Sequence, residues 1–145
     1  MRSPVPSRTL ACLLALVLAG ALVACNDEAL DQLGAPGAHE VTLEVQMGDY
    51  WLAPASGEPV APGGELARLP AHSDVTFHVR NVGSVAHALV IYSEDASDIL
   101  VAAPRLAPGT EAEVRFHFHD EMTVLMRDEE YPDEMRALVV VLEED

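Results

Sequence analysis

The sequence predicts an all-β domain, an antiparallel β-sandwich of about seven strands, in residues 40–145. Two observations support this fold class. Apolar and polar residues alternate with a period of two in several short runs, which is the pattern of half-buried strands. Turn-forming residues separate these runs at intervals of about 8–12 residues, a spacing typical of β-sandwiches and barrels. Residues 1–39 lack this pattern, and we interpret them as a leader and a tether.

The first half of the predicted domain contains three strands. Residues 41–46 alternate between apolar and polar side chains and predict a half-buried strand. The segment 53–64 is rich in Pro and Gly and predicts a loop. Residues 75–80 alternate strictly, and residues 88–92 form a continuous apolar run that predicts a more deeply buried strand.

The second half repeats this organisation with shorter connections. Residues 106–109, Leu-Ala-Pro-Gly, predict a turn, and residues 114–119 alternate again. Residues 122–126 and 137–142 are predicted to be the last two strands. Only residues 95–102 are compatible with a short helix.

Residues 1–24 have the pattern of a secretory signal. Arg2 and Arg8 precede a hydrophobic run of 14 residues, Leu10 to Val23, which is shorter than the roughly 20 residues that a bilayer-spanning helix needs. The run ends in Leu22-Val23-Ala24-Cys25, which resembles the lipobox of bacterial lipoproteins. In that class the cysteine is lipidated and becomes the mature N-terminus. The alternative is an ordinary signal peptide followed by an incidental cysteine.

This assignment predicts a protein anchored to a membrane of the bacterial cell envelope, with its domain outside the cytoplasm, as in a periplasm. Residues 25–39 include Gly34-Ala35-Pro36-Gly37 and predict a flexible tether between the lipid and the domain. Cys12 lies in the signal and Cys25 would carry the lipid. The predicted domain therefore has no thiol for a disulfide, a nucleophile or a metal ligand.

The charge of the predicted mature chain excludes one class of partner. All 24 acidic residues follow Cys25, and only six arginines do, which gives a formal charge of −18. Such a chain does not bind nucleic acid, and it does not dock on anionic lipid by electrostatics. The acidic segments 128–130 and 133–134 are expected to be either solvated loop or a surface for a cation or a basic protein partner.

The order of the predicted strands resembles that of the cupredoxins, the Greek-key sandwiches of blue copper proteins. The most specific element is a strand that ends in Asn81-Val82-Gly83, followed four residues later by His87 and an apolar strand. The resemblance extends from about Glu40 to Leu142. It implies a Greek-key sandwich, and it places His87 at the position of the first copper ligand of the family.

The remaining copper ligands of the family are a Cys, a second His and an axial Met on the loop before the last strand. The Cys position falls near Asp128, and the position of the second His falls around Tyr131. Met135 stands where the axial Met would be. The resemblance therefore implies that a blue or thiolate-bridged copper centre cannot form, whereas His87 and Met135 remain as candidate ligands for copper. The alternative is that both are structural residues.

A second candidate metal site lies on a strand surface. Because Phe116 and Phe118 are expected to face the core, His117 and His119 share the outer face. Two imidazoles so placed can reach one Cu(II), Ni(II) or Zn(II) ion. In the cupredoxin fold the neighbouring strand would contribute His78 to this face. The alternative is a solvated polar surface that holds no ion.

Three classes of function follow from these observations. The first is a membrane-anchored cupredoxin-like lipoprotein that binds copper or another metal through His and Met for handling or sensing. The second is a metal-free cupredoxin-like interaction or structural module of the cell envelope. The third, an enzyme, has little support, because the sequence shows no phosphate loop, no nucleophile beside a base and no paired carboxylates. We expect a protein that is not an enzyme.

Overall fold

The computed structural model describes residues 38–144, which form a β-sandwich of nine strands without a helix. The predicted signal peptide and most of the predicted tether lie outside the described residues. Within the described part, no segment is a helix long and apolar enough to cross a bilayer. The strands are β1 (His39–Gly48), β2 (Trp51–Pro54), β3 (Gly64–Pro70), β4 (Ser73–Asn81), β5 (Leu89–Ser93), β6 (Ile99–Ala102), β7 (Glu111–Phe118), β8 (Met122–Asp128) and β9 (Arg136–Leu142).

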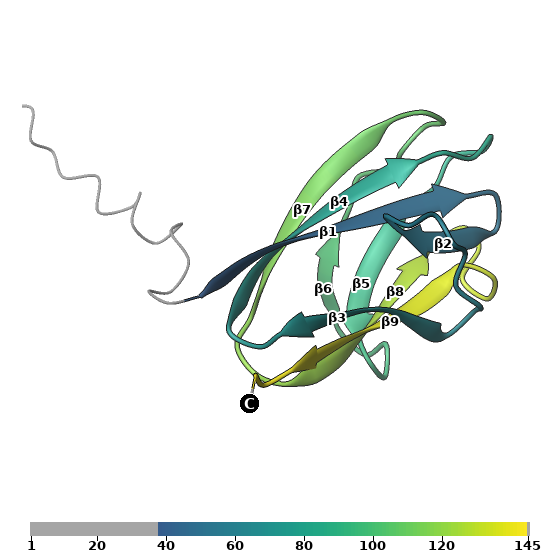
Figure 1. Cartoon of the computed structure of the whole chain (residues 1–145). Helices are drawn as coiled ribbons and strands as arrows, with labels where there is room; N and C mark the ends of the chain where they lie inside the picture. The colour runs from purple at the N-terminus through teal and green to yellow at the C-terminus, as the bar shows by residue number, and fades with distance from the viewer. Residues whose placement is uncertain (1–37, 145) are drawn as a thin grey trace, which may run out of the picture. The chain divides into compact units, whose positions relative to one another are not determined.

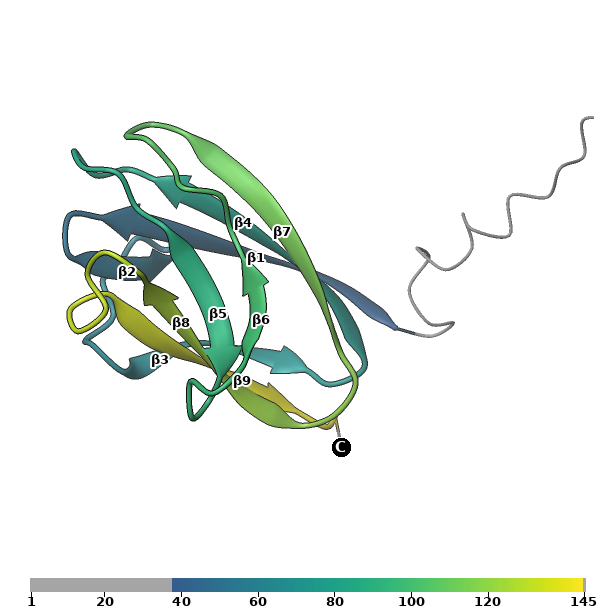
Figure 2. The same ribbon diagram turned by 180° about the vertical axis from the view of Figure 1, so that it is seen from behind.

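Two sheets face each other (Figure 1). One has the strand order β2-β1-β4-β7, and the other has the order β3-β9-β8-β5-β6. The view from behind shows β5 and β6 at the edge of the second sheet, beside β7 of the first (Figure 2). The predicted all-β Greek-key sandwich is therefore confirmed. The pairing is more varied than predicted, since β1 pairs with β4 and β3 with β9 in parallel, while the other pairings are antiparallel.

Alternation along the strands builds the core between the sheets. In β4, Val75, Phe77 and Val79 are buried as predicted, and the polar residues that alternate with them are half-buried or exposed. The Phe77 ring meets Phe118 of β7 edge to face, with ring centroids 6.3 Å apart. From the second sheet, β8 and β9 bury their alternate positions in the same way. Exclusion of these apolar surfaces from water is the main term that holds the two sheets together.

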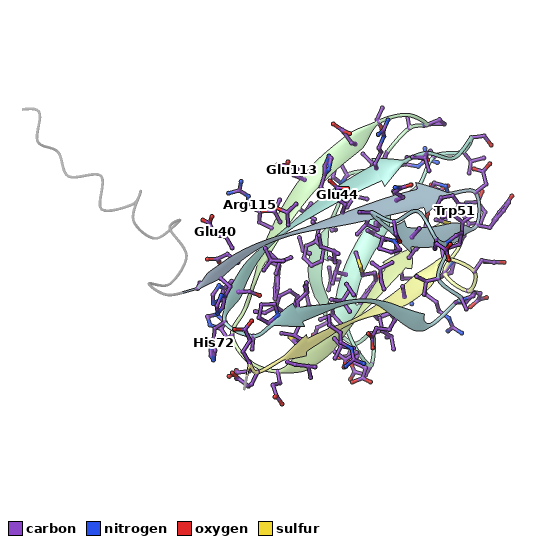
Figure 3. All side chains as sticks on the ribbon, in the orientation of Figure 1. Glu40, Glu44, Trp51, His72, Glu113 and Arg115 are labelled. Carbon is purple, nitrogen blue, oxygen red and sulfur yellow. The ribbon has the colours of Figure 1, made fainter. Side chains whose placement is uncertain are left out.

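The outer face of the four-stranded sheet is polar and charged. Glu44 of β1 and Glu113 and Arg115 of β7 lie on this face and project away from the sandwich (Figure 3). When a sheet is apolar on one face and charged on the other, the charged face is exposed to solvent. This is the face on which the sequence placed the candidate histidine patch.

Residues 95–102 do not form the short helix with which their sequence is compatible. Residues 93–98 form a hairpin turn between β5 and β6, in which Asp95 accepts hydrogen bonds from the hydroxyls of Ser93 and Ser97. These bonds, and one from the Ser97 backbone, lower the pKa of Asp95 to about 2. The apolar residues that follow form β6, because they pair with β5. A short apolar run of this kind does not distinguish helix from strand.

Candidate functional site

Asn81, the last residue of β4, organises the loop that leads to His87. Its buried side-chain amide donates to the carbonyls of Val85 (2.7 Å) and Leu106 (3.0 Å). Its side-chain oxygen accepts from the Gly83 backbone N–H at 2.9 Å. A buried amide with its polar atoms paired holds the loop in one conformation. The Asn-x-Gly pattern in the sequence thus corresponds to a hydrogen-bonded turn.

The same loop is attached to the turn between β1 and β2. Both oxygens of Asp49 accept from Ser84, one from its backbone N–H and one from its hydroxyl, each at 2.6 Å. These hydrogen bonds lower the pKa of Asp49, and the one from the Ser84 hydroxyl has the largest effect. A side chain at Gly83 would place its Cβ 2.4 Å from an Asp49 oxygen and 2.9 Å from the Gly48 and Asp49 backbone. Only glycine fits this close approach.

His87 is fully buried and is bonded to the protein at both its backbone and its ring. Its backbone N–H and C=O pair with Leu106 at 3.0 and 2.8 Å. Its Nδ1 lies 2.5 Å from Oδ2 of Asp128, the last residue of β8, which is also fully buried. The other Asp128 oxygen accepts from the Glu130 backbone N–H at 2.7 Å. A carboxylate that accepts from Nδ1–H fixes the orientation of the imidazole.

The loop 129–135 folds back over this pair. The Tyr131 ring meets the His87 ring at an angle of 66°, with centroids 5.7 Å apart, and it also packs against the Tyr50 ring. Met135 donates its backbone N–H to the Tyr131 carbonyl and accepts from the Asp128 N–H, both at 2.9 Å, and its side chain is fully buried. The structure thus brings together the four positions at which the resemblance placed copper ligands.

The residues at these positions do not fit a blue copper centre. Asp128 stands at the thiolate position, Tyr131 stands near that of the second imidazole, and no cysteine occurs in residues 38–144. Two atoms bound to one ion at about 2.0–2.2 Å are separated by about 3 Å or more. The 2.5 Å between His87 and Asp128 is shorter, so this contact is a hydrogen bond that closes the space between the two groups.

One ring atom in this region has no partner. His87 Nε2 is buried and makes no hydrogen bond to any of the described residues. In the neutral tautomer that donates Nδ1–H to Asp128, Nε2 carries a lone pair that faces protein rather than water. Unpaired buried polar atoms are uncommon and indicate a ligand or a cost in stability. The Tyr131 ring contacts the His87 ring, and Met135 is buried and bonded through its backbone to Tyr131 and Asp128.

The surface histidines do not form the predicted cluster of three. His117 lies opposite Asp74 in the register of β4 and β7, whereas His78 lies opposite Glu113. The pair Thr76 and Arg115 separates them, and the His78 ring lies 3.5 Å from Glu111 instead. Within residues 38–144, no group of three or more His, Cys, Asp or Glu side chains is arranged to hold a metal ion. The spacing of histidines along one strand does not predict how that strand is aligned with its neighbour, so the sequence did not reveal this separation.

The acidic loop 128–134 is partly paired within the protein. Tyr92 donates its hydroxyl to Glu129 at 2.5 Å, which raises the pKa of Tyr92. Arg105 donates to Glu130 at 2.6 Å, and this hydrogen bond lowers the pKa of the Glu130 carboxyl. Asp133 and Glu134 remain exposed at the tip of the loop. The acidic surface that a partner would meet is therefore smaller than the sequence predicted.

Comparisons with known proteins show the fold. No family model matches the chain, and a search of curated proteins gave no significant match. Among solved structures, auracyanin from Roseiflexus castenholzii is 16% identical with a TM-score of 0.54, over 72% of this chain and 98% of that chain. Rusticyanin from Thiobacillus ferrooxidans is 10% identical with a TM-score of 0.58, over 72% and 78%.

A third similar structure is auracyanin A, a blue copper protein from Chloroflexus aurantiacus. It is 18% identical with a TM-score of 0.55, over 70% of this chain and 98% of that chain. Identities this low show the fold and leave function to be argued from the site. The domain has a cupredoxin-like fold.

Proposed function

We propose that this chain is a lipid-anchored cupredoxin-like protein of the bacterial cell envelope whose domain serves as an interaction module without a blue copper centre. The observation that carries the proposal is the buried hydrogen bond between His87 and Asp128. It joins the segment before β5 to the end of β8, and in copper-containing members of the fold we expect the metal to join the same two segments.

The chemistry of the site argues against electron transfer and against catalysis. Without a thiolate there is no strong sulfur-to-copper bond, which the blue copper sites depend on. The His87–Asp128 pair is fully buried, and a general base must come within hydrogen-bond reach of its substrate. We therefore propose that the protein is not an enzyme.

A basic protein partner fits the charge of the molecule better than an acidic one. The predicted mature chain carries a formal charge of −18, which steers cationic surfaces toward it. At the end that holds His87, the exposed residues Asp133 and Glu134 lie in the same loop as Tyr131, and the Tyr50 ring that packs on Tyr131 is 56% exposed. Aromatic and acidic groups together suit a partner that presents Arg or Lys.

A second candidate function is a Cu(I) site at His87 and Met135. The unpaired Nε2 of His87 favours it, because imidazole nitrogen and thioether sulfur are ligands that Cu(I) accepts, and the buried Met135 is bonded through its backbone to Asp128. Such a site would serve copper handling or sensing. It would leave the His87–Asp128 hydrogen bond intact as a support for the ligating ring.

A Cu(I) competition titration distinguishes the two candidates. If the domain is an interaction module with no copper site at His87, Met135→Leu and His87→Ala should leave the Cu(I) affinity of the full chain, purified in detergent, unchanged. Met135→Leu conserves volume and is expected to leave the fold intact, which near-UV circular dichroism would verify. His39→Ala, at an exposed site, is the control. A loss of affinity of tenfold or more in both His87→Ala and Met135→Leu would favour the Cu(I) site and overturn the module.

Replacing the predicted lipidated cysteine tests the anchor. Cys25→Ala should move the protein from the membrane fraction to the soluble fraction, or leave it as an unprocessed precursor, because no acceptor for lipid remains. Cys12→Ala, within the signal, is the matched control and should change nothing. The measurement is fractionation with intact mass, and an unmodified N-terminus at Cys25 in the wild type would contradict the prediction.

A further inference from the structure

Two imidazole rings lie in contact at the end of β7. The centroids of His117 and His119 are 4.3 Å apart and their planes meet at 68°. The His117 side chain is 23% exposed, and His119 is exposed. This pair lies at the end of the sandwich opposite His87, because β4 runs from Ser73, beside Phe118, to Asn81. At a rise of about 3.3 Å per residue, the two ends of β4 are roughly 26 Å apart.

Figure 3 shows the same two ends of the domain. His72, next to β4's first residue, is labelled at one end, and Trp51, in β2, is labelled at the other. The loop that leads to His87 lies at the Trp51 end, since Val82 donates to the Met47 carbonyl near the end of β1. The two imidazole sites are therefore separate.

A carboxylate orients one of the two rings. Asp74 of β4 lies opposite His117 in the sheet register, and its Oδ1 accepts from His117 Nδ1 at 2.7 Å. In the neutral tautomer that donates Nδ1–H to Asp74, Nε2 of His117 is the ring atom with the lone pair. Histidines that bind metal ions almost always donate their other N–H to a carboxylate, a backbone carbonyl or water in this way. The arrangement is a carboxylate–histidine pair with its ligating atom free.

The spacing of the rings suits one shared ion. With metal–nitrogen bonds of about 2.0–2.1 Å, the ion lies roughly 3.2 Å from each ring centroid. Two such rings have centroids about 4.5 Å apart at a right angle and about 5.2 Å apart at the tetrahedral angle. The distance of 4.3 Å between the His117 and His119 centroids is close to the value for a right angle, and a small side-chain rotation would remove the difference.

We propose that His117 and His119 form a two-histidine surface site for a divalent transition-metal ion, Cu(II), Zn(II) or Ni(II), with Asp74 as the orienting carboxylate and water in the remaining positions. The carboxylates of Asp120 and Glu121 follow His119 in the chain and raise the local concentration of cations. His78 takes no part in the site. The proposal does not depend on the proposed function, since it concerns the other end of the domain.

A Cu(II) competition titration of the full chain, purified in detergent, tests this site. His117→Ala and His119→Ala should each lower the Cu(II) affinity by tenfold or more, because each removes one of two imidazole ligands. Asp74→Asn should lower it about 10- to 100-fold, the usual effect of losing an outer carboxylate. Loss of His119, which is exposed and follows the last residue of β7, is not expected to affect folding. His78→Ala is the matched control on the same sheet face and should bind as the wild type does.

Electron paramagnetic resonance of the Cu(II)-loaded chain gives an independent readout. Nitrogen hyperfine coupling from two imidazoles is expected in the wild type and in His78→Ala. In His119→Ala any remaining bound Cu(II) should show coupling from one imidazole. Unchanged affinity in His117→Ala and His119→Ala would overturn the proposal, as would an equal loss in His78→Ala. If His87→Ala alone lost the ion, the metal would lie at the buried end, and that result would overturn both this site and the proposal that the buried end holds no copper.

Discussion

Asp128→Ala is expected to lower the free energy of unfolding of the domain by about 3–5 kcal/mol, the cost of removing one partner from a buried polar pair. The substitution leaves the buried His87 Nδ1 without an acceptor and the Glu130 N–H without its side-chain bond. It also leaves a cavity between the loop and β8. Because about 1 kcal/mol shifts the melting temperature of a domain near this size by about 4 °C or more, thermal and denaturant unfolding would detect the loss easily.

Two further variants separate this effect from a general sensitivity of the loop. Asp128→Asn keeps the shape and one acceptor oxygen, so its loss of stability should be clearly smaller than that of Asp128→Ala. Glu130→Gln removes the exposed contact with Arg105 and should stay close to the wild type, since exposed ion pairs contribute little. If Asp128→Ala unfolded at the wild-type midpoint, the His87–Asp128 bond would not be the connection that holds these segments together.

The double substitution Asp128→Cys with Tyr131→His is expected to convert the domain into a blue copper protein. Asp128 already contacts His87, so a thiolate there would adjoin the first imidazole. The Tyr131 ring centroid lies 5.7 Å from that of His87, and two imidazoles in a trigonal copper plane need about 5.5 Å. Met135 would provide the axial thioether. Added Cu(II) should produce an intense visible sulfur-to-copper charge-transfer band, which the wild type should lack.

The matched control is Asp128→Ser with Tyr131→His, which differs from the first variant by a single atom type. It should bind Cu(II) weakly and show no such band. Absorption spectroscopy measures the outcome, and circular dichroism verifies that both variants are folded. A folded Cys-containing variant that stays colourless with excess Cu(II) would show that Asp128 and Tyr131 do not occupy the ligand positions assigned to them.

Local patterns in the sequence determined most of the strands and the fold class. Strict alternation in residues 75–80 predicted β4, because one face of a strand must be apolar where it meets a core. Asn81, Gly83 and His87 carried the resemblance to cupredoxins, and the structure shows that Asn81 and Gly83 shape the loop before His87. These features are local, since each residue acts on neighbours a few positions away in the chain.

The strands that the sequence missed lack a regular period. In β3 the buried residues Leu66 and Leu69 are three positions apart, because a bulge shifts the register between Glu65 and Ala67. A bulge adds a residue to one strand and interrupts its alternation. In β6 the chain has only four residues, and their pairing with β5 also contains a register shift. The parallel pairings depend on which strands become neighbours, and no single strand sequence specifies its neighbour.

Only the tertiary structure decided how the candidate site is closed. The sequence determined that a cysteine is missing near residue 128, but not that Asp128 there would accept a hydrogen bond from His87, 41 residues away. Asp74 and His117, 43 residues apart, met through the register of β4 and β7 in the same way. Contacts at such separations depend on the order and register of strands, which form only when the two apolar sheet faces pack together. Residue identity therefore determined which ligands are available, and packing determined which of them meet.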